Sequence, residues 1–232
     1  LPQFNFPSRT AYNNNWNIDD ISDIGIVSRL FFQLLASFFI IYNGLYIYDL
    51  GSYYGVSNLT FSFLLIPFTI FCVLILTNAI NFIDGIDGLS SGLVIVGLIT
   101  LSLYIKIFNH EYDLIFLIIL SIIIFSFFIV NIKLTFLNKV FLGDSGSTFL
   151  GFMFSWLLIY YTLPADRLIH PVLVIWCITI PIFDFLRIII FRMLTKSDPS
   201  KPDRNHLHHL LLKRFNNDTI VLFMILSLAS FY

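Results

Sequence analysis

Apolar runs long enough to cross a lipid bilayer dominate this chain of 232 residues. Six runs are complete, and a seventh begins near Thr219. The complete runs are Val27–Tyr48, Leu59–Ile80, Leu89–Ile107, Asp113–Val130, Ser145–Tyr161 and Pro171–Phe191. Only helices and closed barrels satisfy the backbone hydrogen bonds within lipid. Runs of about 20 residues without period-two alternation favour helices. We therefore predict an all-α, polytopic integral membrane helical bundle with about six complete spans plus a partial seventh.

Composition supports this class and excludes others. Hydrophobic residues make up 58% of the chain and charged residues 12%, against about 25% charged residues in soluble domains. A net charge of −1 excludes the basic surface of a nucleic-acid-binding protein. The two cysteines, Cys72 and Cys177, lie inside apolar runs and are interpreted as packing residues rather than a disulfide. Polar residues open the chain and an apolar run closes it, so residues 1–232 are interpreted as one membrane domain, a fragment of a larger one.

Lysine and arginine distinguish the two sides of the predicted bundle. Alternation of the spans places segments 1–26, 81–88, 131–144 and 192–218 on one side and segments 49–58, 108–112 and 162–170 on the other. Eleven of the 13 basic residues belong to the first side, and only Lys106 and Arg167 to the second. Because cytoplasmic loops carry the excess of basic residues, the first side is predicted to be cytoplasmic.

Four polar clusters fall on that same side, although charge alone defined it. They are IDDISD (Ile18–Asp23), NFIDGIDG (Asn81–Gly88), FLGDSGS (Phe141–Ser147) and PDRNHLHH (Pro202–His209). Their shared side predicts one site on the cytoplasmic face, built from several loops.

The first two clusters carry paired carboxylates. Asp20 and Asp23 would share a helix face, and with Asp19 they form either a charged helix cap or a site for a hard cation such as Mg²⁺. Asp84 and Asp87 have the same spacing. Gly85 and Gly88 would allow tight turns beside them, and Asn78 and Asn81 lie one turn earlier. A capped turn between two spans is the simpler interpretation, but it requires fewer polar and glycine residues than this segment contains.

The last two clusters suit anions. Asp144 precedes a predicted helix for which Ser145 and Ser147 are candidate caps, and such a helix terminus binds phosphate readily; a plain cap is the alternative. A zinc site at the histidines is disfavoured because no partner set of ligands is evident. The histidines are instead interpreted, with Arg204, as phosphate-binding cations or proton donors, or as part of a basic loop facing anionic lipid. Asp184 and Arg187, inside the last complete span, are interpreted as a structural ion pair.

Together these motifs resemble those of the polyprenyl-phosphate N-acetylhexosamine-1-phosphate transferases, the MraY/WecA-like family. DDISDIGIVSRLFFQLLAS resembles the family's DDxxD segment and the helix that follows it, and NAINFIDGIDGLSSG its NxxNxxDGxDGLxxG signature. FLGDSGSTFLG resembles GDxGSxxLG, and PDRNHLHHLLL the HxHH loop in its WecA-like form. The motifs follow the family order from Asp19 to Leu212. Family members normally have further spans before DDxxD, which this chain does not contain.

The resemblance implies an activity and its components. HexNAc-1-phosphate would pass from a UDP-HexNAc, by default UDP-GlcNAc, to polyprenyl (undecaprenyl) phosphate, releasing UMP and initiating a cell-envelope polysaccharide such as the lipopolysaccharide O-antigen. It also implies Mg²⁺, with Mn²⁺ as the second choice, and a multi-pass protein of the bacterial inner membrane with its active site on the cytoplasmic face. Family members often form homodimers, and the resemblance implies a homodimer for this chain too.

The resemblance also assigns roles residue by residue. Asp144 is the first choice of metal ligand, with Asp19 or Asp20 beside it, and these three are the predicted catalytic residues. Asn81, Asp84 and Asp87 would hold the nucleotide, and Phe141 would stack on uracil. The basic residues predicted to bind phosphates or sugar are Arg29, Arg204, His206, His208 and His209.

Two alternatives remain open from the sequence. An ion-coupled transporter would also carry glycines and carboxylates at broken helices, but such sites lie near the bilayer midplane, whereas these clusters lie at the cytoplasmic ends of the spans. An inactive truncated fragment with a scaffolding role is the second alternative.

Overall fold

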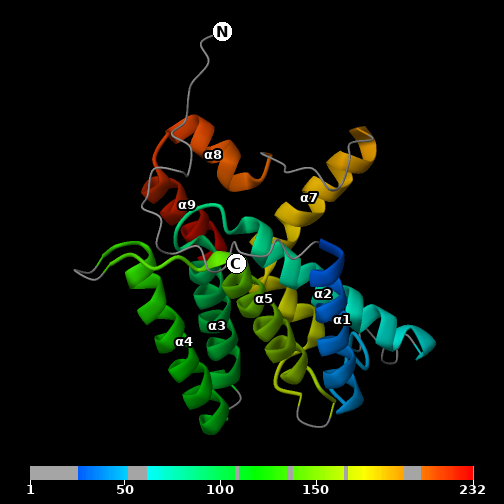
Figure 1. The fold of residues 1–232 in the computed structure, drawn as a ribbon. Helices are drawn as coiled ribbons and strands as arrows, with labels where there is room; N and C mark the ends of the chain where they lie inside the picture. Colours follow the sequence, from blue (N-terminus) through cyan, green and yellow to red (C-terminus); the bar gives the residue numbers. More distant parts are fainter. Residues whose placement is uncertain are drawn as a thin grey trace.

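The computed structural model describes residues 26–51, 62–107, 110–134, 138–164, 167–195 and 205–231. All regular structure in these segments is helical, as predicted (Figure 1). In chain order the helices are α1 (Ile26–Tyr42), η2 (Ser62–Leu64), α2 (Leu65–Ile83), α3 (Leu89–Ile107), α4 (Glu111–Asn131), α5 (Gly143–Tyr160), η3 (Pro171–Leu173), α6 (Val174–Cys177), α7 (Thr179–Thr195), α8 (Leu207–Phe215) and α9 (Asp218–Ser230).

Three of the described helices, α2, α3 and α4, are long and apolar enough to cross a membrane. The number becomes four if the bent segment from Pro171 to Thr195 counts as one span. The chain is a membrane protein on this basis. Helix α5 has 18 residues but begins with the polar sequence GDSGST, and α1 and α9 are shorter. The count of six complete spans is therefore not confirmed and stays a prediction.

The segment Pro171–Phe191, predicted as one continuous span, is instead broken at Ile178, where the helices on either side meet at 86°. Pro181 explains the break, because proline lacks the N–H that would bond to the Cys177 carbonyl and its ring clashes with that carbonyl. The freed carbonyl oxygen lies against Gly97, where a Cβ atom would be only 2.8 Å away. The sequence prediction missed the bend because hydropathy alone registers Pro181 as one more apolar residue.

The core forms where α2 packs on α5 and α3 packs on α4. Helices α2 and α5 approach closely at Gly151, where a Cβ atom would lie 2.9 Å from both the Cα and the carbonyl oxygen of Thr77. Small residues at such crossings let two backbones approach, which is how helices associate in membranes. This crossing brings the end of α2 beside the start of α5, where two of the polar clusters lie.

Gly151→Ala is expected to destabilise the protein by about 1–3 kcal/mol, because the added methyl group meets backbone that cannot move aside. The measurement is the midpoint of thermal unfolding in detergent. Gly146→Ala is the matched control in the same helix, since its methyl group would meet only the Leu142 side chain. An equal midpoint for the two variants would contradict the close crossing.

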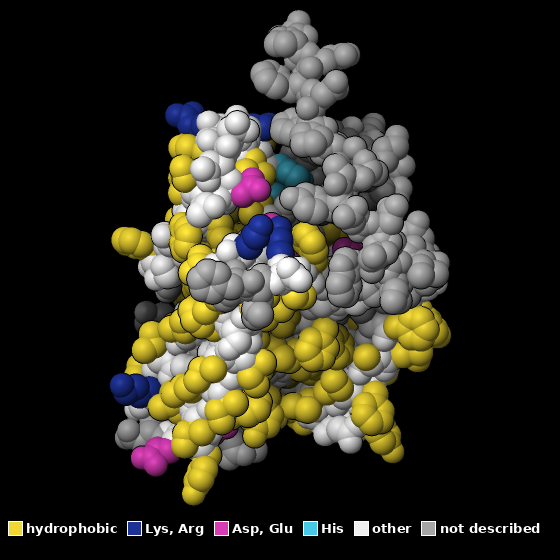
Figure 2. All heavy atoms as spheres, turned by 60° about the vertical axis from the view of Figure 1, so that its left-hand side comes forward, with side chains coloured by type: hydrophobic (Ala, Val, Ile, Leu, Met, Phe, Trp, Pro, Cys, Tyr) yellow, Lys and Arg dark blue, Asp and Glu magenta, His cyan; other side chains and the backbone are white. Residues whose placement is uncertain are grey.

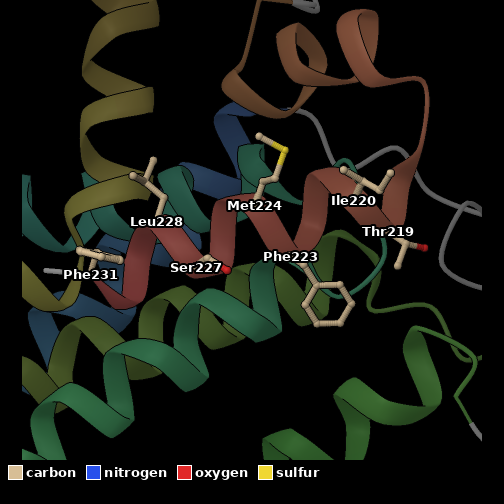
Figure 3. Close-up of a pocket in the computed structure, with 7 residues that line it drawn as sticks. All are labelled: Thr219, Ile220, Phe223, Met224, Ser227, Leu228 and Phe231. Atoms are coloured by element: carbon tan, nitrogen blue, oxygen red, sulfur yellow. The ribbon is translucent and has the colours of Figure 1, made fainter.

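The outer surface is largely apolar, with many exposed Phe, Ile and Leu side chains. Figure 2 shows hydrophobic side chains over most of the lower part of one face, while histidine and several charged side chains gather in the upper half. A shallow hollow of about 620 Å³ lies on α9, and Figure 3 shows the residues that line it, among them Phe223, Met224 and Leu228. Its lining is almost wholly apolar, so this hollow is not the polar site that the motifs predict.

Candidate functional site

The turn between α2 and α3 holds Asp84 and Asp87. Helix α2 ends at Ile83 with Asp84 as its C-cap, so Asn81, predicted in a loop, lies in the last helical turn. Gly88 has φ of +80°, a backbone conformation that glycine adopts without strain. A Cβ atom at Gly88 would also overlap Ile132 and Phe128. The glycine here permits both the turn and its close packing against the end of α4.

Asn131, the last residue of α4, ties this turn to a second polar segment. Its buried side chain accepts a hydrogen bond from the Gly88 N–H and donates one of 2.7 Å to the carbonyl oxygen of Val140. One amide therefore holds the 84–88 turn beside residues 138–142. Asn131 is not among the predicted site residues, although a lone asparagine at the end of an apolar run was the available signal.

Lys139 joins two of the predicted site residues. Its ammonium group forms an ion pair with Asp87 and lies 4.5 Å from the centroid of the Phe141 ring. Phe141 itself is 69% exposed, so its ring is accessible to a ligand. In the sequence Lys139 contributes only to the positive charge of its loop, and its contact with Asp87 and Phe141 arises from the fold.

Asn81 connects the last turn of α2 to the first turn of α5. Its amide nitrogen donates hydrogen bonds to the carbonyl oxygen of Asp144 at 3.2 Å and to the Ser147 hydroxyl at 2.8 Å. The prediction that Ser145 and Ser147 cap this helix is wrong, because α5 begins at Gly143 with no side-chain cap. Ser147 lies inside the helix, where its hydroxyl bonds to the Gly143 carbonyl at 3.1 Å.

The Asp144 carboxylate is open to solvent. Its side chain is 74% exposed and accepts a hydrogen bond of 3.1 Å from Arg29. Exposed ion pairs contribute about 0–1 kcal/mol, so a cationic ligand can replace Arg29 at little cost. One turn along α1 from Arg29, the Gln33 side-chain oxygen accepts a hydrogen bond of 3.1 Å from Asn78, which ties α1 to α2.

The histidine segment is anchored to α7 by Asp184. The Asp184 carboxylate accepts hydrogen bonds from Arg187 and from the Leu207 N–H, each at 2.9 Å. It also lies 2.8 Å from His206 Nδ1. The predicted ion pair between Asp184 and Arg187 is confirmed. The same carboxylate also reaches His206, 22 positions along the chain, a contact that the sequence did not predict.

His208 packs directly against the 84–88 turn. Its ring is 1% exposed, neighbours His209 with ring centroids 4.1 Å apart, and lies so close to Gly85 that a Cβ atom there would overlap it. Burial, together with the charges of His209 and His206, lowers the pKa of His208 to about 3. Within the described residues neither ring nitrogen has a hydrogen-bond partner. His208 is therefore a neutral ring at physiological pH, which corrects its interpretation as a cation.

This burial predicts an acid-sensitive stability. The folded pKa of about 3 lies below the value of about 6.5 for an unfolded histidine, so the unfolded chain binds more protons between these two pH values. The free energy of unfolding from this group should therefore fall by about 1.4 kcal/mol per pH unit as pH decreases below about 6. The measurement is the thermal midpoint of wild type and His208→Gln between pH 7.5 and 4.5. Equal pH dependence in both proteins would contradict it.

The remaining predicted residues, Asp19, Asp20, Asp23 and Arg204, lie outside the described residues. Among those that the structure does describe, no three His, Cys, Asp or Glu side chains gather into a metal-binding group. Mg²⁺ is commonly held by only one or two carboxylates plus substrate phosphates. The exposed Asp144 carboxylate fits that donor set.

Comparison with known proteins decides the family. The model of "Glycosyl transferase family 4" matches residues 17–162, more than half of the chain. This chain belongs to glycosyl transferase family 4. The match covers the segments that carry Asp19, Asp84, Asp87 and Asp144 and ends before the histidine segment.

Individual relatives agree with the WecA-like resemblance. The chain is 32% identical over 198 residues to the undecaprenyl-phosphate alpha-N-acetylglucosaminyl 1-phosphate transferase of Yersinia pestis, and 31% identical over 202 residues to that of Escherichia coli strain K12. It is 30% identical over 199 residues to a probable undecaprenyl-phosphate N-acetylglucosaminyl 1-phosphate transferase of Bacillus subtilis. Each match covers 84% of this chain and 54% of the relative. The chain thus spans about half the length of these curated relatives.

Proposed function

We propose that this chain carries the reaction centre that transfers HexNAc-1-phosphate from a UDP-HexNAc, by default UDP-GlcNAc, to undecaprenyl phosphate. The products would be polyprenyl-diphosphate-HexNAc and UMP. The names of the family relatives support the reaction class. The observation that carries the proposal is the placement of Asp144, which Asn81 holds at the junction of α2 and α5 with its carboxylate open to solvent.

The reaction brings two anionic phosphates together, so the site must offset their repulsion. An oxygen of the lipid phosphate attacks the phosphorus that carries the sugar, and the bond from that phosphorus to the UMP oxygen breaks. Arg29 and Lys139 supply positive charge beside Asp144 and Asp87, and the start of α5 adds the positive end of a helix dipole. Asp144, with Asp19 or Asp20, would hold Mg²⁺, or Mn²⁺ as the second choice, which neutralises diphosphate charge when bound.

The attacking lipid phosphate requires little activation. A phosphate monoester has a second pKa of about 6, so its oxygen is already ionised at neutral pH. Asp19 or Asp20 is the candidate base if one acts. Because the ionised lipid phosphate can attack directly, a covalent aspartyl-phosphate intermediate is the less favoured route.

The nucleotide would bind beside the 84–88 turn. Phe141 presents an exposed ring for stacking on uracil, and Asp84 and Asp87 would accept hydrogen bonds from the nucleotide. Lys139, between Asp87 and Phe141, would exchange its ion pair for contact with the ligand. Asn81 positions Asp144 through its amide nitrogen. Arg204, His206 and His209 would contact phosphate or sugar oxygens, while the buried His208 would support the 84–88 turn from beneath.

The same proposal includes location and assembly. The excess of basic residues on one side supports a site on the cytoplasmic face of the bacterial inner membrane. The lipid acceptor would reach the site from the bilayer, and the product would initiate a cell-envelope polysaccharide such as the lipopolysaccharide O-antigen. A homodimer is the expected assembly from the family resemblance.

Formation of a labelled lipid tests the proposal. Membranes containing this chain, alone or joined to the N-terminal spans of a family member, would be supplied with undecaprenyl phosphate and a series of labelled UDP-sugars. We expect labelled lipid and UMP in equal amounts with at least one UDP-HexNAc. Uptake of solute without lipid product would favour a transporter. No lipid product from either form would contradict the proposal.

A further inference from the structure

Asp184 is a buried carboxylate in a helix that the proposed reaction does not otherwise use. It is 5% exposed, and both of its oxygens are engaged. One oxygen accepts from Arg187 and from the Leu207 N–H, each at 2.9 Å, and the other lies 2.8 Å from His206 Nδ1. Two of these three contacts go to the histidine segment rather than to α7 itself. A structural ion pair alone would need only Arg187.

Helix α8 depends on this carboxylate for its N-terminal cap. The first N–H groups of a helix have no partner within it and usually bond to the side chain of the preceding residue. His206 occupies that position, but its side chain makes no capping bond. Asp184 accepts from the N–H of Leu207, the first residue of α8, in its place. Arg187 also donates to the carbonyl oxygen of Asn205, so the backbone on both sides of His206 is tied to α7.

The same contacts determine which nitrogen of His206 can meet a ligand. An ionised carboxylate only accepts hydrogen bonds, so the Nδ1 atom that faces Asp184 carries a proton. Any contact between His206 and a ligand must then use Nε2. The ring plane is held by stacking on Phe82 and His208, with centroids 6.2 Å and 5.8 Å away. His206 is thus restricted in position, in ring plane and in tautomer.

We propose that Asp184, supported by Arg187, is a positioning residue that fixes His206 with its Nδ1–H on the carboxylate and its Nε2 directed to a phosphate or sugar oxygen of the substrate. The catalytic part of this inference rests on the proposed transferase function. The tautomer part rests on geometry alone. The two parts can therefore be tested separately.

The catalytic part is tested with a double-mutant cycle of Asp184→Asn and His206→Asn. An asparagine keeps the shape of Asp184 but can donate to Nδ1, which reverses the tautomer. We expect Asp184→Asn to lower kcat about 10- to 100-fold, the size of loss found for carboxylates that orient metal-bound histidines, with the KM for the lipid unchanged. In the His206→Asn background the same change should have no further effect. Equal losses in both backgrounds would overturn the positioning role.

The tautomer part is tested without activity. Solid-state NMR of the full chain in liposomes, labelled with ¹³C and ¹⁵N at histidine, distinguishes protonated Nδ1 from protonated Nε2, and His206→Asn assigns the signal. We expect a protonated Nδ1 in the wild type, which requires no variant of Asp184 to fold. A neutral ring protonated at Nε2 alone would overturn the inference. Absence of lipid product with a protonated Nδ1 would instead contradict the proposed function.

Discussion

Asp144→Asn is expected to lower Mg²⁺-dependent release of UMP by about 10²–10³-fold or more, the loss seen when one electrostatic group aimed at a developing charge is removed. The carboxamide keeps the size of the side chain but loses the charge that a hard cation requires. The Asn81 bond to the backbone carbonyl of Asp144 does not involve the carboxylate, so the fold should persist. The measurement is UMP release at saturating Mg²⁺ and UDP-sugar.

Asp218→Asn is the matched control for that experiment. Asp218 is also an exposed aspartate in the first turn of a helix, and its loss should affect stability through the helix dipole by about 0.3–1 kcal/mol without affecting turnover. Full activity of Asp144→Asn would remove Asp144 from the proposed metal site. An equal loss of turnover in both variants would show that negative charge on the surface in general, rather than the position of Asp144, supports the reaction.

Gly85→Ala is expected to abolish detectable turnover and to lower the thermal midpoint. A methyl group at Gly85 would overlap the His208 ring, and His208 is buried, with 1% of its surface exposed. Overpacking of this kind costs about 1–3 kcal/mol, and relief of the overlap would separate the Asp84 turn from the histidine segment. The measurements are the unfolding midpoint and the rate of lipid product formation.

The double variant Gly85→Ala with His208→Ala separates the steric effect from other causes. Removal of the ring removes the overlap, so the midpoint should rise above that of Gly85→Ala alone. Turnover should stay low because the histidine segment loses its packing on the 84–88 turn. A midpoint that does not recover would show that Gly85 is required for its backbone rather than for the space beside His208.

Several features of the fold were predictable because they depend on local composition. Long apolar runs without alternation indicate helices whatever their neighbours are, and the all-α class is confirmed. Motif order was enough to indicate the family, since the spacing of Asp84, Asp87 and Asp144 in the sequence requires no coordinates. Helix ends were less predictable: α5 begins two residues before the expected cap at Ser145, because helix starts depend on tertiary contacts such as that of Asn81.

The sequence by itself determined the helical class and the family motifs, and it predicted the sidedness of the basic residues and most candidate site residues. Only the tertiary structure decided that Pro181 divides the last long apolar segment, that Asn131 and Lys139 join two loops, and that Asp184 holds His206. The physical reason is the range of the interactions. Hydropathy and motif spacing act along the chain, whereas a buried carboxylate or amide takes its partners from whichever helix packs beside it.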